Sequence, residues 1–267
     1  MPTLHTLLES AESLRVDAVA QVPFCADVVG SLPAEVHLAA VERGFDLLPI
    51  REDDGRIRRV VETRALRCAV NWEHALSSAV VLDADALVAR EAPVFSLLER
   101  FDGREILFTL GREGVDGVVT IYDLNQPAAH LLGFGLVLIT EAKLAQALRD
   151  ALGEDSDEVL RRVSMTLGCK RQSVKRWVGA RDEGKEIHLS STITFGEKLD
   201  VLGSCGLTEL AETYDMARDE LLQDLKEIRE FRNALAHYDE QDHRLTDPRW
   251  AYEHMRRASR LARVFAA

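Results

Sequence analysis

Apolar positions along this chain follow two patterns, and the change between them falls near residues 141–155. Before this point, short apolar runs of strand length alternate with longer stretches in which apolar residues recur every three or four positions. After it, helical spacing dominates. The sequence therefore predicts an α+β fold in two parts, a module of small sheets and helices over residues 1–145 and an all-α bundle over residues 146–267.

The first part shows the same order of elements twice, over residues 14–70 and 75–140. Each copy reads strand, helix, strand, turn, strand, helix. In the first copy the turn is Asp53-Asp54-Gly55 between two apolar runs, which is a hairpin signal. The second copy starts near Ala79-Val80-Val81-Leu82, and its turn lies at residues 111–114. A repeat of this length predicts one structural unit used twice.

The last strand of the second copy carries the most specific residues of this part, Gly117-Val118-Val119-Thr120-Ile121-Tyr122-Asp123-Leu124. They resemble the Gly-x-x-Thr-x-x-Asp pattern of CBS domains, and the resemblance covers about residues 14–140. It implies a tandem module that binds an adenine nucleotide, with Thr120 near phosphate at a helix N-terminus and Asp123 accepting from ribose hydroxyls. The alternative is structural, because a Thr N-cap and an acid in the first turn stabilise many helices.

The matching turn of the first copy departs from that pattern. Arg59, Glu62 and Ala65 stand where the pattern has Gly, Thr and Asp. The carboxylate that would hold ribose is therefore missing in this copy. The resemblance implies at most one nucleotide half-site of the usual type, and it leaves a dimerisation or scaffold role open.

Helical spacing predicts four segments in the second part: residues 154–181 with a break at Gly168, 195–202 bounded by Gly203, 207–237, and 249–265. In the third segment, apolar residues recur at three- and four-residue steps and form one stripe. Four to five helices of this kind predict an up-and-down bundle. His243 and His254, which flank the start of the last helix, are expected at the surface.

Residues 163–177 resemble a helix-turn-helix. A small residue, Ser164, lies four before Gly168, and Val174 and Trp177 follow on the second helix. A basic second helix of this kind can enter a major groove of DNA. Two other interpretations remain: a helical hairpin whose Lys and Arg side chains face water, and a basic face on which Lys175 and Arg176 hold RNA phosphates.

Near the end of the third helical segment, the run Phe231-Arg232-Asn233-Ala234-Leu235-Ala236-His237-Tyr238 places a cation, an amide and an imidazole close together. Arg232 keeps its charge and can fork onto a phosphate. Asn233 lies one helical turn before His237, whose ordinary pKa near 6.5 lets it accept or donate a proton at neutral pH. These are the groups needed to cleave RNA without a metal, and Tyr238 can stack on a base.

The order Arg, polar residue, His resembles the signature of the HEPN superfamily, and this resemblance covers roughly residues 150–267. It implies an endoribonuclease that needs no cofactor, uses Arg232, Asn233 and His237, and leaves a 2′,3′-cyclic phosphate. One chain supplies one imidazole of the acid–base pair, so the resemblance also implies a homodimer. The structural alternative is that Asn233 and His237 satisfy carbonyl groups at a helix end.

Composition limits the partners and the location. The 267 residues carry a net charge of −12, and residues 1–153 hold 14 Lys and Arg against 23 Asp and Glu. This balance argues against broad coating by nucleic acid but permits a local basic patch. The four cysteines are widely spaced, which predicts no metal site. No secretory signal and no apolar run of about 18 to 20 residues is evident, which predicts a cytoplasmic protein without a membrane partner.

The sequence therefore predicts a metal-independent endoribonuclease, with RNA as substrate and a CBS-like module that gates it on binding an adenine nucleotide. Such a fusion is typical of toxin or phage-defence systems, in which an antitoxin or other regulator restrains the activity. Two alternatives stay open. One is a non-catalytic nucleotide-sensing or dimerisation scaffold, and the other is a DNA-binding regulator that uses the region around Gly168.

Overall fold

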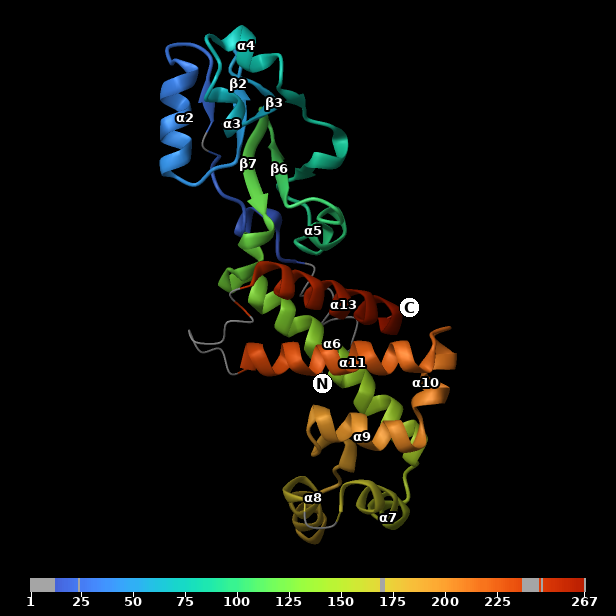
Figure 1. Ribbon diagram of the computed structural model, residues 1–267. Helices are drawn as coiled ribbons and strands as arrows, with labels where there is room; N and C mark the ends of the chain where they lie inside the picture. The colour runs from blue at the N-terminus through green and yellow to red at the C-terminus, as the bar shows by residue number, and fades with distance from the viewer. Residues whose placement is uncertain (1–12, 24, 169–170, 237–244, 246, 267) are drawn as a thin grey trace. The chain divides into compact units, whose positions relative to one another are not determined.

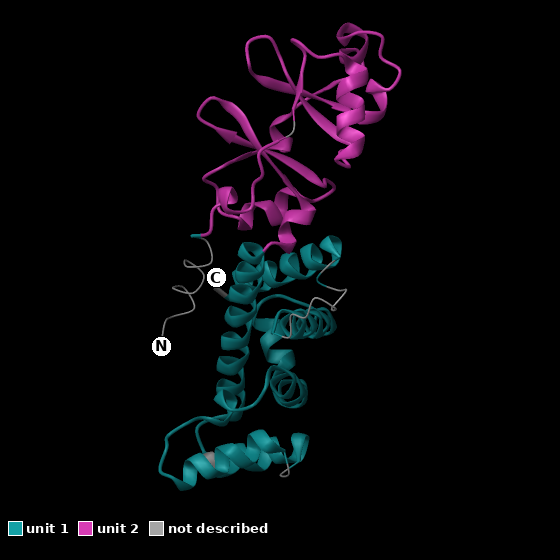
Figure 2. Cartoon of the chain, turned by 90° about the vertical axis from the view of Figure 1, so that its left-hand side faces the viewer, with its two compact units in different colours: residues 1–13, 127–267 teal, residues 14–126 magenta. Residues whose placement is uncertain are grey.

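The computed structural model describes residues 13–23, 25–168, 171–236, 245 and 247–266. The chain forms two compact units: an N-terminal unit, residues 14–126, and a helical unit, residues 127–267 together with residues 1–13 (Figure 2). Small sheets lie in the first unit and the described elements of the second are all helices, so the fold is α+β (Figure 1). The sequence placed the boundary after residue 145, whereas helix α6 (Pro127–Leu152) runs unbroken through that position.

The elements of the N-terminal unit follow the predicted order of strands and helices. They are η1 (Val16–Ala18), β1 (Ala26–Asp27), α2 (Pro33–Glu42), β2 (Leu47–Arg51), β3 (Ile57–Glu62), α3 (Thr63–Leu66), α4 (Trp72–Leu76), β4 (Val80–Val81), η2 (Ala84–Ala86), β5 (Leu87–Ala89), α5 (Phe95–Arg100), β6 (Ile106–Gly111), β7 (Gly114–Thr120) and η3 (Ile121–Asn125).

The two copies have the same topology. In the first, β1 pairs parallel with β2 across α2, and β2 pairs antiparallel with β3. In the second, β5 pairs parallel with β6 across α5, and β6 pairs antiparallel with β7. The predicted hairpin turn is present between β2 and β3, where Gly55 has a φ of +78°. Glycine suits this position because other residues are strained at positive φ.

Each copy also contributes a main-chain segment that pairs with the sheet of the other copy. The main chain of Gln21, which precedes β1, exchanges two hydrogen bonds of 2.9 Å with Val118 in the second sheet. Strand β4, ahead of β5, pairs with β3 of the first sheet. Residues 79–82 were predicted to open the second copy, but β4 completes the first sheet instead. A two-residue strand has too little pattern to reveal its partner in advance.

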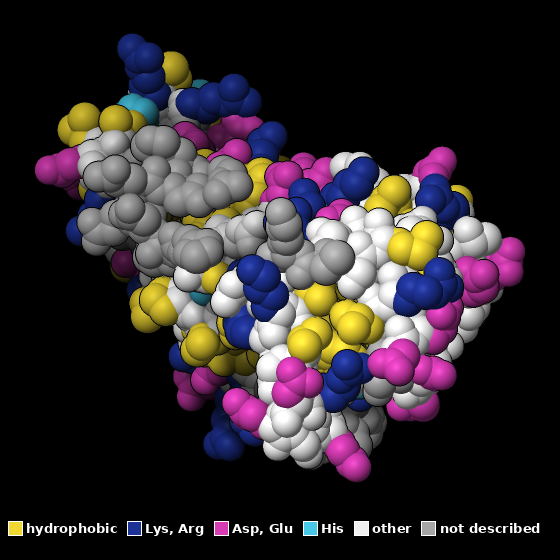
Figure 3. Space-filling view, turned by 90° about the horizontal axis from the view of Figure 1, so that it is seen from below, with side chains coloured by type: hydrophobic (Ala, Val, Ile, Leu, Met, Phe, Trp, Pro, Cys, Tyr) yellow, Lys and Arg dark blue, Asp and Glu magenta, His cyan; other side chains and the backbone are white. Residues whose placement is uncertain are grey.

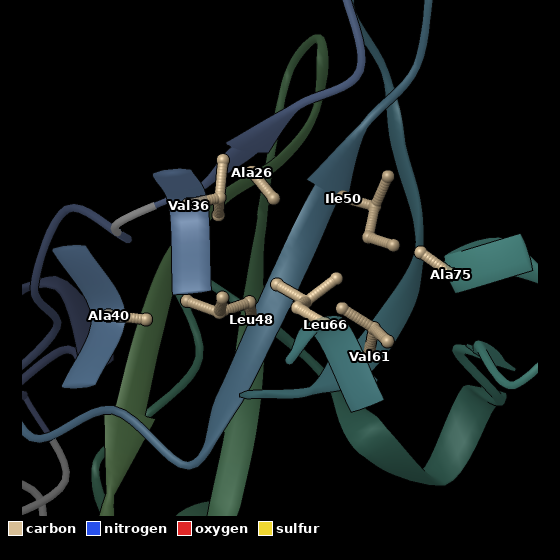
Figure 4. Packing of buried hydrophobic residues seen from close by; sticks show 8 residues of the cluster. All are labelled: Ala26, Val36, Ala40, Leu48, Ile50, Val61, Leu66 and Ala75. Atoms are coloured by element: carbon tan, nitrogen blue, oxygen red, sulfur yellow. The ribbon is translucent and has the colours of Figure 1, made fainter. Parts of the chain in front are cut away.

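The core of the first copy lies between the sheet and its helices (Figure 4). Helix α2 and helix α3 cover the sheet, and eight buried apolar residues fill the space between them. They are Ala26, Val36, Ala40, Leu48, Ile50, Val61, Leu66 and Ala75. Leu48 and Ile50, alternate residues of β2, reach this core because side chains of a strand alternate between its two faces.

The helical unit is built around α6. Its described elements are α6, α7 (Ser156–Leu167), α8 (Gln172–Asp182), η4 (Leu189–Ser191), α9 (Phe195–Cys205), α10 (Leu207–Thr213), α11 (Arg218–Ala236) and α13 (Pro248–Ala266). Helices α9, α11 and α13 all pack against α6. The arrangement agrees with the expected all-α bundle, and the predicted break at Gly168 separates α7 from α8.

By length and composition, α6 is also apolar enough to cross a membrane, contrary to the expectation that no run would reach that length. Within the unit it holds the position of a core helix, with Leu136, Ile139 and Leu144 fully buried. Such a helix passes the same hydropathy test as a membrane span. Its apolar character continues onto the solvent side, where Leu131 is 73% exposed.

Two helix ends differ from the sequence prediction. The expected helix over residues 207–237 is interrupted: α10 ends at Thr213, and Asp215 has a φ of +51°. The main-chain nitrogen of Met216 donates to the Ala211 carbonyl (2.9 Å), which closes a Schellman motif. Helix α9 in turn continues through Gly203 and ends at Cys205. At the end of α10, Asp215 rather than a glycine has the left-handed conformation. The sequence therefore lacked the glycine that usually marks the end of a helix.

Candidate functional site: the C-terminal end of helix α11

Helix α11 carries the two candidate catalytic residues that the structure describes, and its inner face fixes it in the bundle. Leu221, Leu225, Ile228 and Phe231 are fully buried along one stripe, as the three- and four-residue spacing predicts. The Phe231 ring lies against Gly133 of α6 and 5.8 Å from the Trp250 ring of α13, centroid to centroid. The residue before Arg232 is therefore held by contacts to two other helices.

Ion pairs between α11 and α13 fix the rotation of α11 about its axis. Asp224 binds Arg260, and Glu220 lies 3.0 Å from the same guanidinium. Glu227 pairs with Arg257 at 3.3 Å and with His254 at 3.0 Å. Because Asp224 is only 5% exposed, its pairing satisfies a charge that would otherwise be buried alone.

His254 lies inside the unit, and the prediction that it would be a surface residue is wrong. The side chain is 3% exposed and stacks on Trp250 with ring centroids 3.9 Å apart. Its Nδ1 bonds to the Trp250 carbonyl oxygen (2.7 Å) and its Nε2 faces Glu227. His254 is therefore a structural residue of the bundle. His243 lies outside the described residues.

Arg232 and Asn233 lie together at the surface, one turn before the described end of α11. Nη1 of Arg232 donates to Oδ1 of Asn233 at 3.4 Å. Asn233 is exposed and Arg232 is half-buried. Glu227, which lies on the same helix as Arg232, is engaged by His254 and Arg257. Among the described residues, Arg232 forms no ion pair. His237 and Tyr238 lie outside the described residues.

Lys175 and Arg176 are exposed on α8, on the side that does not pack. The opposite side of α8, with Ser173, Val174 and Trp177, is buried in the unit. Helix α9 lies between α8 and α11 (Figure 1). Within one chain, the structure therefore does not bring Lys175 and Arg176 together with Arg232 and Asn233.

The candidate nucleotide residues form a capping box at the turn after β7. Oδ2 of Asp123 accepts from the main-chain nitrogen (2.7 Å) and the hydroxyl (2.9 Å) of Thr120. Oδ1 accepts from the side-chain amides of Gln126 (2.9 Å) and Gln21. A carboxylate offers about four acceptor positions, so these four donors occupy Asp123 fully. Asp123 is 3% exposed, and these hydrogen bonds are the ones that a structural role of the residue would require.

The equivalent turn of the first copy holds no such cap. Glu62, the counterpart of Thr120, ends β3 and pairs with Arg64 at the surface. Ala65 occupies the position of Asp123 and offers no acceptor. This copy thus has no carboxylate at the position of Asp123. The role of Gln21 was not foreseen, because it lies 102 residues before Asp123 in the chain.

Metal and thiol chemistry find little support among the described residues. In that part of the chain, no three His, Cys, Asp or Glu side chains lie close enough together to hold a metal ion. Cys25, Cys68 and Cys205 are free thiols. Burial raises the pKa of the Cys25 and Cys205 thiols, which disfavours the reactive thiolate.

Comparisons with known proteins concern the N-terminal part. No protein-family model and no curated protein matches the chain. Among solved structures, it is similar to the CBS domain of a bacterial CNNM/CorC family Mg²⁺ transporter in complex with ATP (14% identity, 45% of this chain and 91% of that chain, TM-score 0.36). It is also similar to a CBS domain pair in complex with 5′-methylthioadenosine and S-adenosyl-L-methionine (13%, 41% and 95%, 0.34).

A third similar structure is a CBS domain-containing protein of unknown function from Bacillus anthracis (12% identity, 44% of this chain and 94% of that chain, TM-score 0.35). These likenesses lie in the N-terminal part of the chain and concern its fold alone. The tandem organisation itself rests on the matched topology and the exchanged backbone segments of residues 14–126.

Proposed function

We propose that the helical unit is a metal-independent endoribonuclease of HEPN type. The observation that carries this proposal is the surface pair of Arg232 and Asn233 at the end of α11, where Arg232 has no ion-pair partner among the described residues. A guanidinium beside an amide suits a phosphodiester, because both groups donate hydrogen bonds to phosphate oxygens. His237 follows the last described residue of α11 in the sequence.

In the proposed reaction, the ribose 2′-oxygen attacks the adjacent phosphorus and the phosphorus–O5′ bond breaks. One imidazole takes the 2′-hydroxyl proton, and a second gives a proton to the leaving 5′-oxygen. Arg232 offsets the charge that develops on the phosphorane, and Asn233 orients the phosphate. The products are a 2′,3′-cyclic phosphate and a 5′-hydroxyl end, with no change in oxidation state and no metal needed.

The reaction needs two imidazoles, whereas the motif supplies one in each chain. A homodimer in which two copies of α11 face each other across a two-fold axis would provide the pair. The rigid seating of α11, through Phe231 and the ion pairs to α13, supports this arrangement because it would hold each Arg232 at a fixed place. RNA is the proposed substrate.

The test is cleavage of a labelled RNA by the full chain in EDTA, with the ends identified by mass spectrometry. Arg232→Ala and His237→Ala should each lower the rate by about 10²-fold or more, and Asn233→Ala by less. Lys226→Ala, which removes an exposed cation from the same helix, should leave the rate unchanged. Wild-type rates in the Arg232→Ala and His237→Ala proteins would overturn the proposal.

For the N-terminal unit, the turn after β7 supports a second function, binding of an adenine nucleotide. Two side-chain amides, from Gln21 and Gln126, converge on one oxygen of Asp123. Neighbouring hydroxyls of a ribose would present the same two donors to that oxygen. Binding at this turn would therefore displace both amides, and Gln21 belongs to the segment that joins the first copy to the second sheet.

Isothermal titration with AMP, ATP and S-adenosylmethionine tests this second function. Gln21→Ala removes a competitor for Asp123, so it should strengthen nucleotide binding, whereas Asp123→Asn should weaken it. If neither the wild-type nor the Gln21→Ala protein binds a nucleotide, this second function is wrong, and the scaffold role is favoured for the N-terminal unit. The same nucleotides added to the cleavage assay would reveal gating as a change in the rate of RNA cleavage.

A further inference from the structure

The segment of residues 156–182 forms two helices joined by a tight turn. Helix α7 ends at Leu167, and α8 begins at Gln172. Gly168 between them has a φ of +81°, a conformation that favours glycine. The two helices and the break at Gly168 agree with the sequence, and neither proposed function uses this segment.

The inner faces of both helices are held by the unit. Val159 and Val163 of α7 and Val174 and Trp177 of α8 are all nearly fully buried. Nε1 of Trp177 donates to the Ile187 carbonyl (2.6 Å). The hydroxyl of Ser173 donates to Glu197 at the start of α9 (2.8 Å). These contacts fix α8 on a rigid support and leave its outer face free.

Charge is distributed unevenly in this segment. Residues 161–181 contain seven Lys and Arg and no Asp or Glu, although the whole chain has a net charge of −12. Arg161 and Arg181 pair with acids of the first turn of α7, Glu158 and Asp157. Figure 3 views the molecule from the end formed by α7 and α8, and basic and acidic side chains both occur on this face.

The cations at the start of α8 are not neutralised in this way. Lys175 and Arg176 are exposed and form no ion pair with any residue that the structure describes. Arg171, just ahead of the helix, is also exposed, and its charge helps to lower the pKa of Glu197. Gln172 shares the outer face, and at Gly179 no side chain projects. The outer face of α8 therefore presents cations and an amide without acids between them.

We propose that α7 and α8 form a helix-turn-helix that binds duplex DNA, with the outer face of α8 in the major groove. An α-helix fits the major groove of B-form DNA, which is about 12 Å wide. Arg and Lys side chains bind guanine edges or phosphates there, and Gln binds adenine. Gln172, Lys175 and Arg176 thus have the chemistry of a base-reading helix, and they lie in its first half, where such helices contact bases.

The same face is poorly suited to RNA. The major groove of A-form RNA is too narrow to admit a helix, and single strands are bound by stacking on exposed aromatic rings. Trp177 is the sole aromatic residue in the sequence of residues 156–182, and it is buried. Lys175 and Arg176, which the sequence also assigned to RNA phosphates, are therefore placed here on duplex DNA. This inference does not depend on ribonuclease activity.

Fluorescence anisotropy of the full chain with a labelled pool of random 30-base-pair DNA, in about 50 mM salt, tests the proposal. Duplex DNA should bind, with an affinity that falls as salt rises. The Lys175→Ala/Arg176→Ala double variant should bind at least tenfold more weakly, and the slope of log affinity against log salt should decrease by about 2. The double variant Arg112→Ala/Lys226→Ala removes two exposed cations elsewhere and should bind like wild type.

Two further measurements separate recognition of the base sequence from sequence-independent electrostatic binding to DNA. Sequence selection from the random pool should yield a preferred site, and Gln172→Ala should change the preference at one position while the affinity for random DNA stays the same. Circular dichroism melts of all variants should match wild type, because the replaced side chains are exposed. An absence of duplex binding, or a stronger loss of RNA binding than of DNA binding in the Lys175→Ala/Arg176→Ala protein, would overturn the proposal.

Discussion

Nε2 of His254 on α13 lies 3.0 Å from Oε2 of Glu227 on α11, in the interior of the helical unit. The two residues are 27 positions apart and join the helix that carries Arg232 to the last helix of the chain. His254 also bonds to the Trp250 carbonyl and stacks on the Trp250 ring. The pair therefore links the candidate catalytic helix α11 to helix α13 of the bundle.

Replacing His254 should weaken the contact between α11 and α13. His254→Ala removes a buried ring and leaves Glu227 with one partner fewer, so we expect a loss of about 2 to 3 kcal/mol in the free energy of unfolding. Urea denaturation followed by circular dichroism measures it. His74→Ala, which changes an exposed histidine of α4, serves as the control and should cost less than about 0.5 kcal/mol. Equal stability of the two variants would contradict the interior role of His254.

Gly133 should be intolerant of even the smallest side chain. A Cβ at this position would lie 2.9 Å from the ring of Phe231, whereas a Cβ at Gly203 of α9 would meet no atom within 4 Å. Gly133→Ala should therefore destabilise the protein by about 1 to 3 kcal/mol through overpacking. Gly203→Ala should stabilise it by up to about 1 kcal/mol, since alanine favours helix. Thermal melts of the two variants should shift in opposite directions.

Acid should loosen the contact between α8 and α9. Burial raises the pKa of Glu197, but hydrogen bonds from Thr194 and Ser173 and the charge of Arg171 outweigh it, and the pKa lies below its ordinary value of 4.5. Because the pKa of Glu197 is lower in the folded than in the unfolded protein, the ionised carboxylate stabilises the fold fully at pH above the ordinary value. This stabilisation is lost as the pH falls through the lower pKa of the folded state. Glu197→Gln should flatten the stability profile below pH 4.5, measured by denaturation at successive pH values.

Asp123 should be essential for the stability of the N-terminal unit. Asp123→Ala removes the acceptor for four donors and a helix cap, for an expected cost of about 3 kcal/mol. Asp123→Asn keeps one acceptor oxygen and should cost less. Asp85→Ala, at an exposed carboxylate, is the matched control. Hydrogen exchange of residues 114–126 should increase in Asp123→Ala, and an unchanged exchange rate would argue against the cap.

Local patterns predicted the elements that depend on neighbouring residues. The Asp53-Asp54-Gly55 hairpin, the turn at Gly168 and the apolar stripe of α11 were all visible in the sequence, because turn residues and helical spacing act over a few positions. The match between the two copies of the N-terminal unit followed from the same signals.

Features set by distant partners could not be predicted in this way. His254 looked like a surface residue because it is polar, and Glu227, its partner, lies on another helix. Asp123 looked available to a ligand because Gln21 is remote in sequence. The stop at Asp215 was hidden since an aspartate holds the left-handed position that glycine usually marks. His254 and Asp123 are polar residues whose surroundings depend on tertiary contacts, which the local sequence does not reveal.

The backbone exchange within the N-terminal unit has a consequence for how it folds. Gln21 completes the sheet that contains Val118, and β4 completes the sheet that contains β3. Neither half can then reach its native edge before the other is present, so residues 14–126 should unfold in one cooperative transition. A fragment that ends between the halves would expose an unpaired strand edge and aggregate. The two copies are thus duplicated in sequence but inseparable as folding units.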